Sequence, residues 1–112
     1  MDCLFCKIIQ GKIPSREVYR DEECYAFGDI NPQAPVHFLV VPREHIKSTA
    51  EAAASHAELL GRLLLTGAQI ARDKGLGNGY RVVINTGPDG GQTVDHLHVH
   101  ILGGRHMTWP PG

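Results

Sequence analysis

The 112-residue sequence predicts an α+β fold, in which a mainly antiparallel five-stranded sheet carries one main helix and a short N-terminal helix. Two observations predict this class. Three β-rich stretches precede one long amphipathic stretch and two follow it, and short turn-rich connections join them. Short connections favour antiparallel pairs, because a parallel pair needs a longer crossover. The length is near the commonest domain size, so we expect residues 1–112 to form one domain.

Side-chain patterns predict the elements, and turn residues separate them. Stretches rich in β-branched and aromatic side chains predict strands, and clusters of Gly, Pro, Asn and Asp predict the turns between them. The short helix is expected at residues 3–10, where Gly11 ends it. The strands are expected at residues 16–21, 23–29, 36–41, 79–85 and 94–102.

The main helix is predicted by leucines and alanines that recur at three- and four-residue spacing between residues 59 and 71. Two Ser-x-x-Glu sequences precede it, and each fits a capping box, in which the serine caps the helix. We favour the second, from Ser55 to Glu58, as the helix start. Gly75 is expected to end the helix, which then spans about five turns.

Composition excludes several classes of function. Eleven Lys and Arg residues are scattered among twelve Asp and Glu residues, and the formal net charge is −1. Proteins that bind long nucleic acids usually carry a basic face, so we expect no nucleic acid polymer as a partner, whereas a mononucleotide site stays possible. No apolar run reaches the ~18–20 residues of a membrane span, and no signal peptide is indicated. Three cysteines are too few for a disulfide framework, so we expect a cytoplasmic protein with no membrane partner.

Three histidines alternate with apolar residues in the last predicted strand. On a strand, His96, His98 and His100 would share one face. His96 and His100 would then stand about 13 Å apart, so these three side chains could not hold one metal ion together. A solvated strand face is the plainer alternative. The row lies on a strand otherwise built for burial, which favours acid–base or nucleophilic chemistry by imidazole.

A glycine-rich loop, residues 86–93 (TGPDGGQT), comes directly before this strand. Its backbone N–H groups could bind a phosphate, or the loop could be an ordinary hairpin turn. The neighbouring histidines favour the phosphate interpretation. Together they predict a covalent reaction, in which a neutral imidazole attacks phosphorus and an imidazolium stabilises the charge.

The segment His96-Leu-His98-Val-His100-Ile-Leu resembles the His-φ-His-φ-His-φ-φ signature of the histidine triad (HIT) superfamily, where φ is apolar. Residues 27–38 (FGDINPQAPVHF), residues 89–93 (DGGQT) and the ending Trp-Pro-Pro-Gly resemble its Hint branch, the histidine triad nucleotide-binding proteins. The resemblance spans essentially the whole chain. It implies a HIT-like fold, with the sheets of two subunits joined across a homodimer.

The resemblance also implies an activity. Hint proteins bind purine nucleoside monophosphates and hydrolyse phosphoramidates, in which AMP or GMP is joined to an amine by a P–N bond. His98 would be the nucleophile that forms a nucleotidyl-histidine intermediate. His100 would contact the phosphate and assist proton transfer, supported by His96 and His37. Asp29 would accept the ribose hydroxyls. The implied nucleotide-binding residues are Phe5, Phe27, Asp29, Ile30, Asn85, Gly91, Gln92, Thr93, His98 and His100.

Two departures from the Hint pattern bear on the pocket. Thr93 stands where serine is common, which predicts a more crowded leaving-group site. Gly28 replaces a larger residue beside the ribose carboxylate, which predicts a looser pocket. Two other functions stay open, a dinucleoside polyphosphate hydrolase of the Fhit type and a nucleotide-binding interaction protein. The Trp-Pro-Pro-Gly ending favours the phosphoramidase, and the intact triad argues against a protein that only binds.

Cys3-x-x-Cys6 has the spacing of half a zinc site, but no second local pair follows it. Several bacterial HIT proteins that resemble this one begin in the same way and bind zinc. The resemblance therefore implies a structural zinc ion held by Cys3, Cys6, His45 and His96, with two free thiols as the alternative. Such a closed shell leaves no open position for water, so we expect no metal to be required for catalysis.

Overall fold

All five predicted strands form in the computed structural model, which describes residues 2–112, so the first residue of the expected domain lies outside the described range. The strands are β1 (Glu17–Arg20), β2 (Cys24–Gly28), β3 (Val36–Pro42), β4 (Tyr80–Val83) and β5 (Val99–Gly103). They pair in the order β1-β2-β3-β5-β4, and all neighbours are antiparallel. The predicted five-stranded antiparallel sheet is confirmed.

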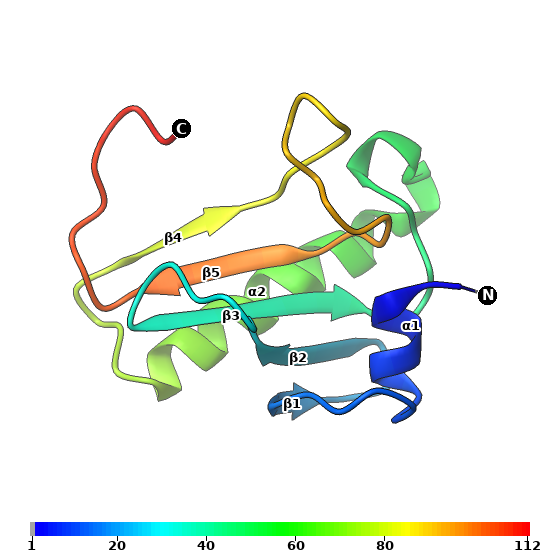
Figure 1. Cartoon of the computed structure of the whole chain (residues 1–112), viewed down its shortest axis with the longest axis horizontal. Coiled ribbons are helices and arrows are strands. Elements are labelled where there is room, and N and C mark those ends of the chain that lie inside the picture. The colour runs from blue at the N-terminus through cyan, green and yellow to red at the C-terminus, as the bar shows by residue number, and fades with distance from the viewer. Residues whose placement is uncertain (1) are drawn as a thin grey trace.

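Helices pack on both faces of this sheet (Figure 1). The long helix α2 (Ala57–Asp73) buries one face, and the short helix α1 (Leu4–Ile9) packs against the other. Side chains along β2 alternate between them, since Ala26 belongs to the α2 core and Phe27 to the α1 core. Because α1 has only six residues, it covers only one end of this face of the sheet (Figure 1).

The last strand is shorter than predicted. We expected residues 94–102, but the ladder begins at Val99. The N–H of Leu97 donates instead to the carbonyl oxygen of Ile46 at 2.7 Å, in the loop that follows β3. The proline that ends β3 has no N–H to continue the ladder. His96 and His98 both precede β5, so the prediction that the three histidines share one face of a strand is wrong.

α2 begins within the second Ser-x-x-Glu sequence, as predicted, and its end is confirmed, but the predicted serine cap is wrong. Two 3-10 turns, η1 (Thr49–Glu51) and η2 (Ala54–His56), lead into the helix, and no side chain caps its first residue. His56 forms the local bonds instead. Its Nδ1 accepts from the Ala53 N–H at 2.9 Å, and its Nε2 lies 2.9 Å from Glu44 Oε2. Gly75 ends the helix with φ of 79°. No helix among residues 2–112 is long and apolar enough to cross a membrane.

Two adjacent leucines of α2 differ sharply in burial, and this difference predicts their contributions to stability. Leu63 is 0% exposed in the α2 core, whereas Leu64 is 45% exposed. We expect Leu63→Ala to lower the free energy of unfolding by roughly 2–5 kcal/mol and Leu64→Ala by less than about 1 kcal/mol. Both changes have the same effect on helix propensity, so urea denaturation of the pair isolates burial. Equal losses would contradict this packing.

Candidate active site

Four polar side chains meet on the α1 face of the sheet. His100 projects from β5, His37 from β3, and Asp29 follows β2, while His98 stands just before β5. His37 Nε2 lies 3.0 Å from His100 Nδ1 and 3.3 Å from Asp29 Oδ2. The rings of His98 and His100 are 4.9 Å apart. The structure therefore brings together three of the four histidines predicted to act in catalysis.

The hydrogen-bond network assigns the protons of His37 and His100. The backbone N–H of Gln33 donates to His37 Nδ1 at 3.0 Å, so the proton of a neutral His37 ring sits on Nε2. From there it can be donated to His100 Nδ1. A neutral His100 that accepts at Nδ1 carries its own proton on Nε2. His100 is thus prepared to donate from the far side of its ring.

His98 has the opposite tautomer. Its Nδ1 lies 2.7 Å from the carbonyl oxygen of His96, which can only accept, so the proton is on Nδ1 and a lone pair is on Nε2. The side chain is buried, and the edge-on ring of Phe5 lies 5.1 Å away at 89°. Among residues 2–112, no protein group bonds to His98 Nε2, and this nitrogen is not sealed from solvent. A nitrogen lone pair held in this way can act as a nucleophile.

Both rings open into a cavity of about 670 Å³, which is within the range of small-molecule sites. One end is apolar and aromatic, with Phe5 and Phe27 in edge-to-face contact at 5.3 Å. The lining also includes the polar side chains of His98, His100 and Asp29. Of the predicted nucleotide-binding residues, the lining includes Phe5, Phe27, Asp29, Ile30, Thr93, His98 and His100.

Three predicted nucleotide-binding residues, Asn85, Gly91 and Gln92, are not among the lining residues. The side-chain amide of Gln92 braces the glycine-rich loop. Its Oε1 accepts from the Gly87 N–H at 3.0 Å, and its Nε2 donates to the carbonyl oxygen of Lys47 at 2.7 Å and to that of Val94 at 3.0 Å. In this arrangement Gln92 shapes the loop beside the cavity.

Sequence reasoning missed several lining residues that are ordinary apolar side chains, and it missed Arg16. A Cβ atom at position 28 would lie only 2.9 Å from Arg16 Nη2. The space that Gly28 leaves is therefore occupied by the Arg16 guanidinium, which no pattern in the sequence indicates. The apolar lining residues not predicted are Leu4, Ile8, Ile13, Pro14, Pro32, Leu39 and Val94.

Burial changes the acidity of His100. Desolvation, together with the neighbouring His98 and His37, lowers the pKa of His100 from its ordinary value of 6.5 to about 4, against an opposing effect of Asp29. Desolvation also lowers the pKa of His37, against an opposing effect of Asp29. In the ligand-free protein both rings are therefore neutral near neutral pH.

The lowered pKa of His100 predicts how stability depends on pH. As the pH falls from about 6.5 towards 4, His100 is protonated in the unfolded chain but stays neutral in the folded protein. The free energy of unfolding therefore decreases in this pH window and is highest above it. We expect His100→Gln to lose less stability than the parent between pH 7 and pH 5. The comparison isolates His100, because both proteins keep the same other histidines. Urea midpoints that fall equally in both proteins would contradict this effect.

A second cluster lies on the other side of His98, next to α1. It contains Cys3, Cys6, His45 and His96, and their ligand atoms all lie within 4.8 Å of one another. His96 Nδ1 is 3.3 Å from Cys3 Sγ, 3.6 Å from Cys6 Sγ and 3.2 Å from His45 Nδ1. His45 Nδ1 is 3.5 Å from Cys6 Sγ. The structure brings together all four residues predicted to bind zinc.

The donor set of this cluster fits a tetrahedral zinc ion. Zinc–sulfur and zinc–nitrogen bonds of ordinary length place neighbouring ligand atoms roughly 3.3–3.8 Å apart, which is close to the separations found here. The carbonyl oxygen of Pro42 lies 2.8 Å from His96 Nε2, so Nε2 carries the proton and Nδ1 offers its lone pair to the cluster. Burial, with the hydrogen bond to Cys3, raises the pKa of the Cys6 thiol to about 11. A nearby dication would reverse that shift.

The cluster of Asp29, His37 and His100 also has compact geometry, but its protons are arranged differently. His37 Nδ1 is occupied by the Gln33 N–H, so its Nε2 carries a proton and has no lone pair for a metal. The atom that bonds to the second nitrogen thus decides the role of each ring. His96 offers a ligand to a metal, and His37 offers a proton.

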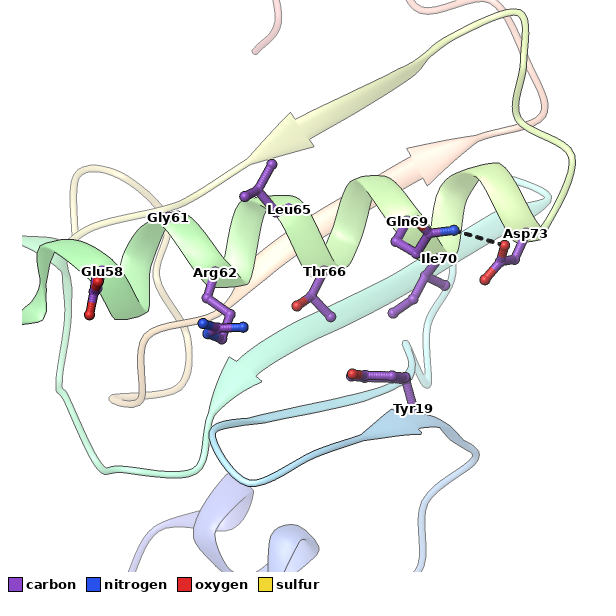
Figure 2. Close-up of a pocket in the computed structure, with 9 residues that line it drawn as sticks. All are labelled: Tyr19, Glu58, Gly61, Arg62, Leu65, Thr66, Gln69, Ile70 and Asp73. Carbon is purple, nitrogen blue, oxygen red and sulfur yellow. Dashed lines mark hydrogen bonds between the residues drawn. The ribbon is translucent and has the colours of Figure 1, made fainter.

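A further hollow lies on the opposite side of the sheet, between α2 and β1 (Figure 2). Tyr19 forms its floor below the helix, and Gln69 Nε2 donates to Asp73 Oδ1 at 3.1 Å at one end. Its nine lining residues include no histidine or cysteine. We therefore assign the chemistry to the histidine cavity.

The chain is similar to known proteins along nearly its whole length. Residues 2–109 match the model of the family described as "Scavenger mRNA decapping enzyme C-term binding". An uncharacterized HIT-like protein of Synechococcus elongatus is 59% identical over 111 residues, which cover 99% of this chain and 97% of that protein. The 14 kDa zinc-binding protein of Zea mays is 53% identical, covering 97% of this chain and 87% of that protein.

Solved structures match along nearly the whole chain. A HIT family hydrolase from Legionella pneumophila superimposes with a TM-score of 0.97 at 48% identity, covering 99% of this chain and all of that chain (100%). A histidine triad protein from Clostridium difficile superimposes with a TM-score of 0.93 at 45% identity, covering 96% and 95%. Fold and site together define a small protein with a histidine cavity on an antiparallel sheet, and the predicted HIT-like fold is confirmed. The chain belongs to the histidine triad superfamily.

Proposed function

We propose that this protein is a Hint-type nucleoside phosphoramidase, which hydrolyses the P–N bond of purine nucleoside 5′-phosphoramidates. One observation supports this most strongly. His98 and His100 open into the same cavity in opposite tautomers, one with a lone pair and the other with a proton on Nε2. A nucleophile beside a proton donor is the pair that cleavage of a P–N bond requires.

In this proposal the cavity orients AMP or GMP. The base lies between Phe5, Phe27 and Ile30, and the ribose hydroxyls donate to the Asp29 carboxylate. The phosphate then faces His98 and His100, with Thr93 at the side of the leaving group. Asn85, Gly91 and Gln92 contribute through the shape of the glycine-rich loop.

The proposed reaction has two steps, transfer of the nucleotidyl group to His98 and then its hydrolysis. First, His98 Nε2 forms a bond to phosphorus as the P–N bond breaks, and the departing amine takes a proton from His100. Binding of the phosphoramidate anion next to His100 favours uptake of a proton from solvent at Nδ1, and the His37 Nε2 proton then turns from His100 to Asp29 Oδ2, which lies 3.3 Å away. Asp29 Oδ2, 3.9 Å from His100 Nδ1, is positioned to stabilise the cationic His100 ring. In the second step water attacks phosphorus, gives its proton to His100 and releases the nucleoside monophosphate, which frees His98.

The proposal is tested by comparing two substrates. We expect turnover of an AMP phosphoramidate with a fluorescent amine as leaving group, and much slower cleavage of a dinucleoside polyphosphate. Faster cleavage of the dinucleoside polyphosphate would favour a hydrolase of the Fhit type. Binding of AMP without cleavage of either substrate would favour a nucleotide-binding interaction protein. Either result would overturn the phosphoramidase.

We propose that the protein works as a homodimer in which each one-domain chain, residues 1–112, joins its sheet to that of its partner through β4. This strand is an edge of the sheet and carries exposed apolar side chains at Tyr80 and Val82, and the exposed Ile84 follows it directly. Leu65, 73% exposed, points from α2 away from Tyr19 and towards the β4 side (Figure 2). An uncovered apolar edge strand favours pairing with another strand.

The dimer predicts the effect of a charge at this edge. We expect Val82→Glu, at a side chain that is 42% exposed, to give a monomer, because it would place a carboxylate from each subunit within the apolar paired edges. Tyr19→Glu is the matched control, since Tyr19 is 39% exposed on the opposite edge strand β1. Light scattering gives the mass of each. A parent monomer, or a dimer that Tyr19→Glu disrupts and Val82→Glu does not, would contradict this interface.

We further propose that zinc is the resident ion of the Cys3, Cys6, His45 and His96 cluster. The four ligands close the shell, so the ion would hold α1 to the loop before β5 and supply no water for catalysis. The relative from maize named a zinc-binding protein supports this assignment. Reduced cysteines are needed to hold the ion, which is consistent with a cytoplasmic location.

A further inference from the structure

We propose that the zinc cluster of Cys3, Cys6, His45 and His96 positions both the nucleophile and the aromatic wall of the nucleotide cavity, so that zinc and nucleotide raise each other's affinity. This inference rests on the proposed function, because it needs AMP to bind in the histidine cavity. It claims more than a structural role, because an ion that only stabilised the fold would leave the affinity for the nucleotide unchanged.

The first connection runs through His96. Its Nδ1 belongs to the cluster, its Nε2 donates to the Pro42 carbonyl oxygen at 2.8 Å, and its own carbonyl oxygen accepts from His98 Nδ1 at 2.7 Å. The same residue therefore offers a metal ligand and the acceptor that fixes the nucleophile's tautomer. Holding the His96 ring at Nδ1 reduces the freedom of the peptide group that orients His98. His96 is thus a positioning residue.

The second connection runs through Phe5. Cys3 and Cys6 flank it in sequence, and Cys3 is the residue at which α1 begins. The Phe5 ring lies 5.1 Å from the His98 ring, 5.9 Å from the His96 ring and 5.3 Å from the Phe27 ring, all edge-on. A six-residue helix is marginal in isolation. Anchoring Cys3 and Cys6 to one ion therefore fixes the wall against which the base would pack.

The two connections lead to a reciprocal effect. Zinc that orders Phe5 and the His96 carbonyl removes part of the ordering cost of nucleotide binding, and a bound nucleotide removes the same part of the cost of binding zinc. The Asp29 side chain, which would contact the ribose, is not connected to the zinc cluster in this way. Asp29 follows β2, and no contact joins it to the cluster among residues 2–112.

The test measures zinc affinity by competition with a chromophoric chelator, using the full chain with and without saturating AMP. We expect AMP to tighten zinc binding about tenfold. Phe5→Ala keeps all four ligands and is expected to reduce this factor to about threefold or less. Asp29→Asn is the matched control. It should weaken AMP binding, but at saturating AMP the tenfold increase in zinc affinity should remain. Calorimetry of AMP binding is recorded for each protein.

The outcomes separate this inference from the proposed function. AMP that binds with the expected stoichiometry and leaves zinc affinity unchanged overturns the coupling alone, and so does an equal factor in the parent and Phe5→Ala. AMP that binds to neither the zinc-loaded nor the zinc-free protein overturns the proposed function. If circular dichroism shows that the zinc-free chain has lost its sheet, the coupling is tested instead with the cobalt-loaded protein. Its visible bands should shift on AMP addition in the parent, and unchanged bands overturn the coupling.

Discussion

Replacement of His98 by alanine is expected to lower the turnover of an AMP phosphoramidate by at least about 10³-fold. The imidazole at this position has its Nδ1 proton held by the His96 carbonyl oxygen at 2.7 Å, which leaves Nε2 as a fixed lone pair. No other described side chain in the cavity combines these features. His100 is arranged in the opposite sense, with Nδ1 next to the His37 Nε2 proton at 3.0 Å.

The measurement separates chemistry from binding. Turnover of the fluorescent substrate and calorimetric AMP affinity are recorded for the parent, His98→Ala and His106→Ala. His106 is an exposed histidine outside the cavity, so its loss should leave turnover unchanged. AMP should bind His98→Ala within about tenfold of the parent, because the base and ribose contacts remain. Full turnover in His98→Ala would show that the nucleophile is another group.

Loss of a zinc ligand is expected to have the largest effect on stability. Cys3→Ser should abolish metal binding and lower the free energy of unfolding by several kcal/mol, roughly 3–5, since a structural zinc contributes its binding energy directly to folding. The loss extends beyond the bond itself, because α1 buries Phe5, Ile8 and Ile9 against β2 and β3. Treatment of the parent with a strong chelator should reproduce most of it.

A third cysteine provides the control. Cys24 is buried in the α2 core, on the opposite face of the sheet from the cluster. Cys24→Ala should therefore keep one zinc per chain in native mass spectrometry, even though the smaller side chain costs about 1 kcal/mol. Equal metal content in Cys3→Ser and the parent would contradict the assignment of the ligands.

The strands in the first half of the chain are well predicted by their β-branched, aromatic and apolar residues, and β2 and β3 pair without a break in register. Ala26 and Phe27 face opposite cores, as a period of two requires. The same rule fails at His96. Its N–H donates to the carbonyl oxygen of Val94, and the next N–H donates outside the sheet. Alternation presumes a ladder, and nothing in the local pattern shows that pairing begins only at Val99.

The helix start shows a different limit. Ser55 has the right spacing for a capping box, but the η2 turn comes first and the His56 ring takes the Ala53 N–H. His56 also lies 2.9 Å from Glu44 Oε2, a residue twelve positions away. A long-range partner of this kind overrides a local preference for capping.

The tautomer of each histidine also could not be predicted from the sequence. The proton positions of His96, His98 and His37 are set by the backbone groups of Pro42, His96 and Gln33. Backbone groups carry no residue-specific signal, so only the three-dimensional arrangement shows which ring nitrogen carries the proton and which keeps the lone pair. The triad motif predicted the residues, and the structure supplies the geometry for their roles.

The proposed mechanism depends on a covalent nucleotidyl-histidine intermediate at His98, and trapping this intermediate tests the mechanism. The protein is mixed with an excess of an AMP phosphoramidate that has a good leaving group, denatured at alkaline pH during the first turnovers, and digested for mass spectrometry. Alkaline conditions preserve a bond between phosphorus and histidine nitrogen. We predict one AMP group on the peptide that contains His98, absent in His98→Ala. Release of the amine with an unmodified His98 peptide, or an adduct on a different residue, would contradict the account.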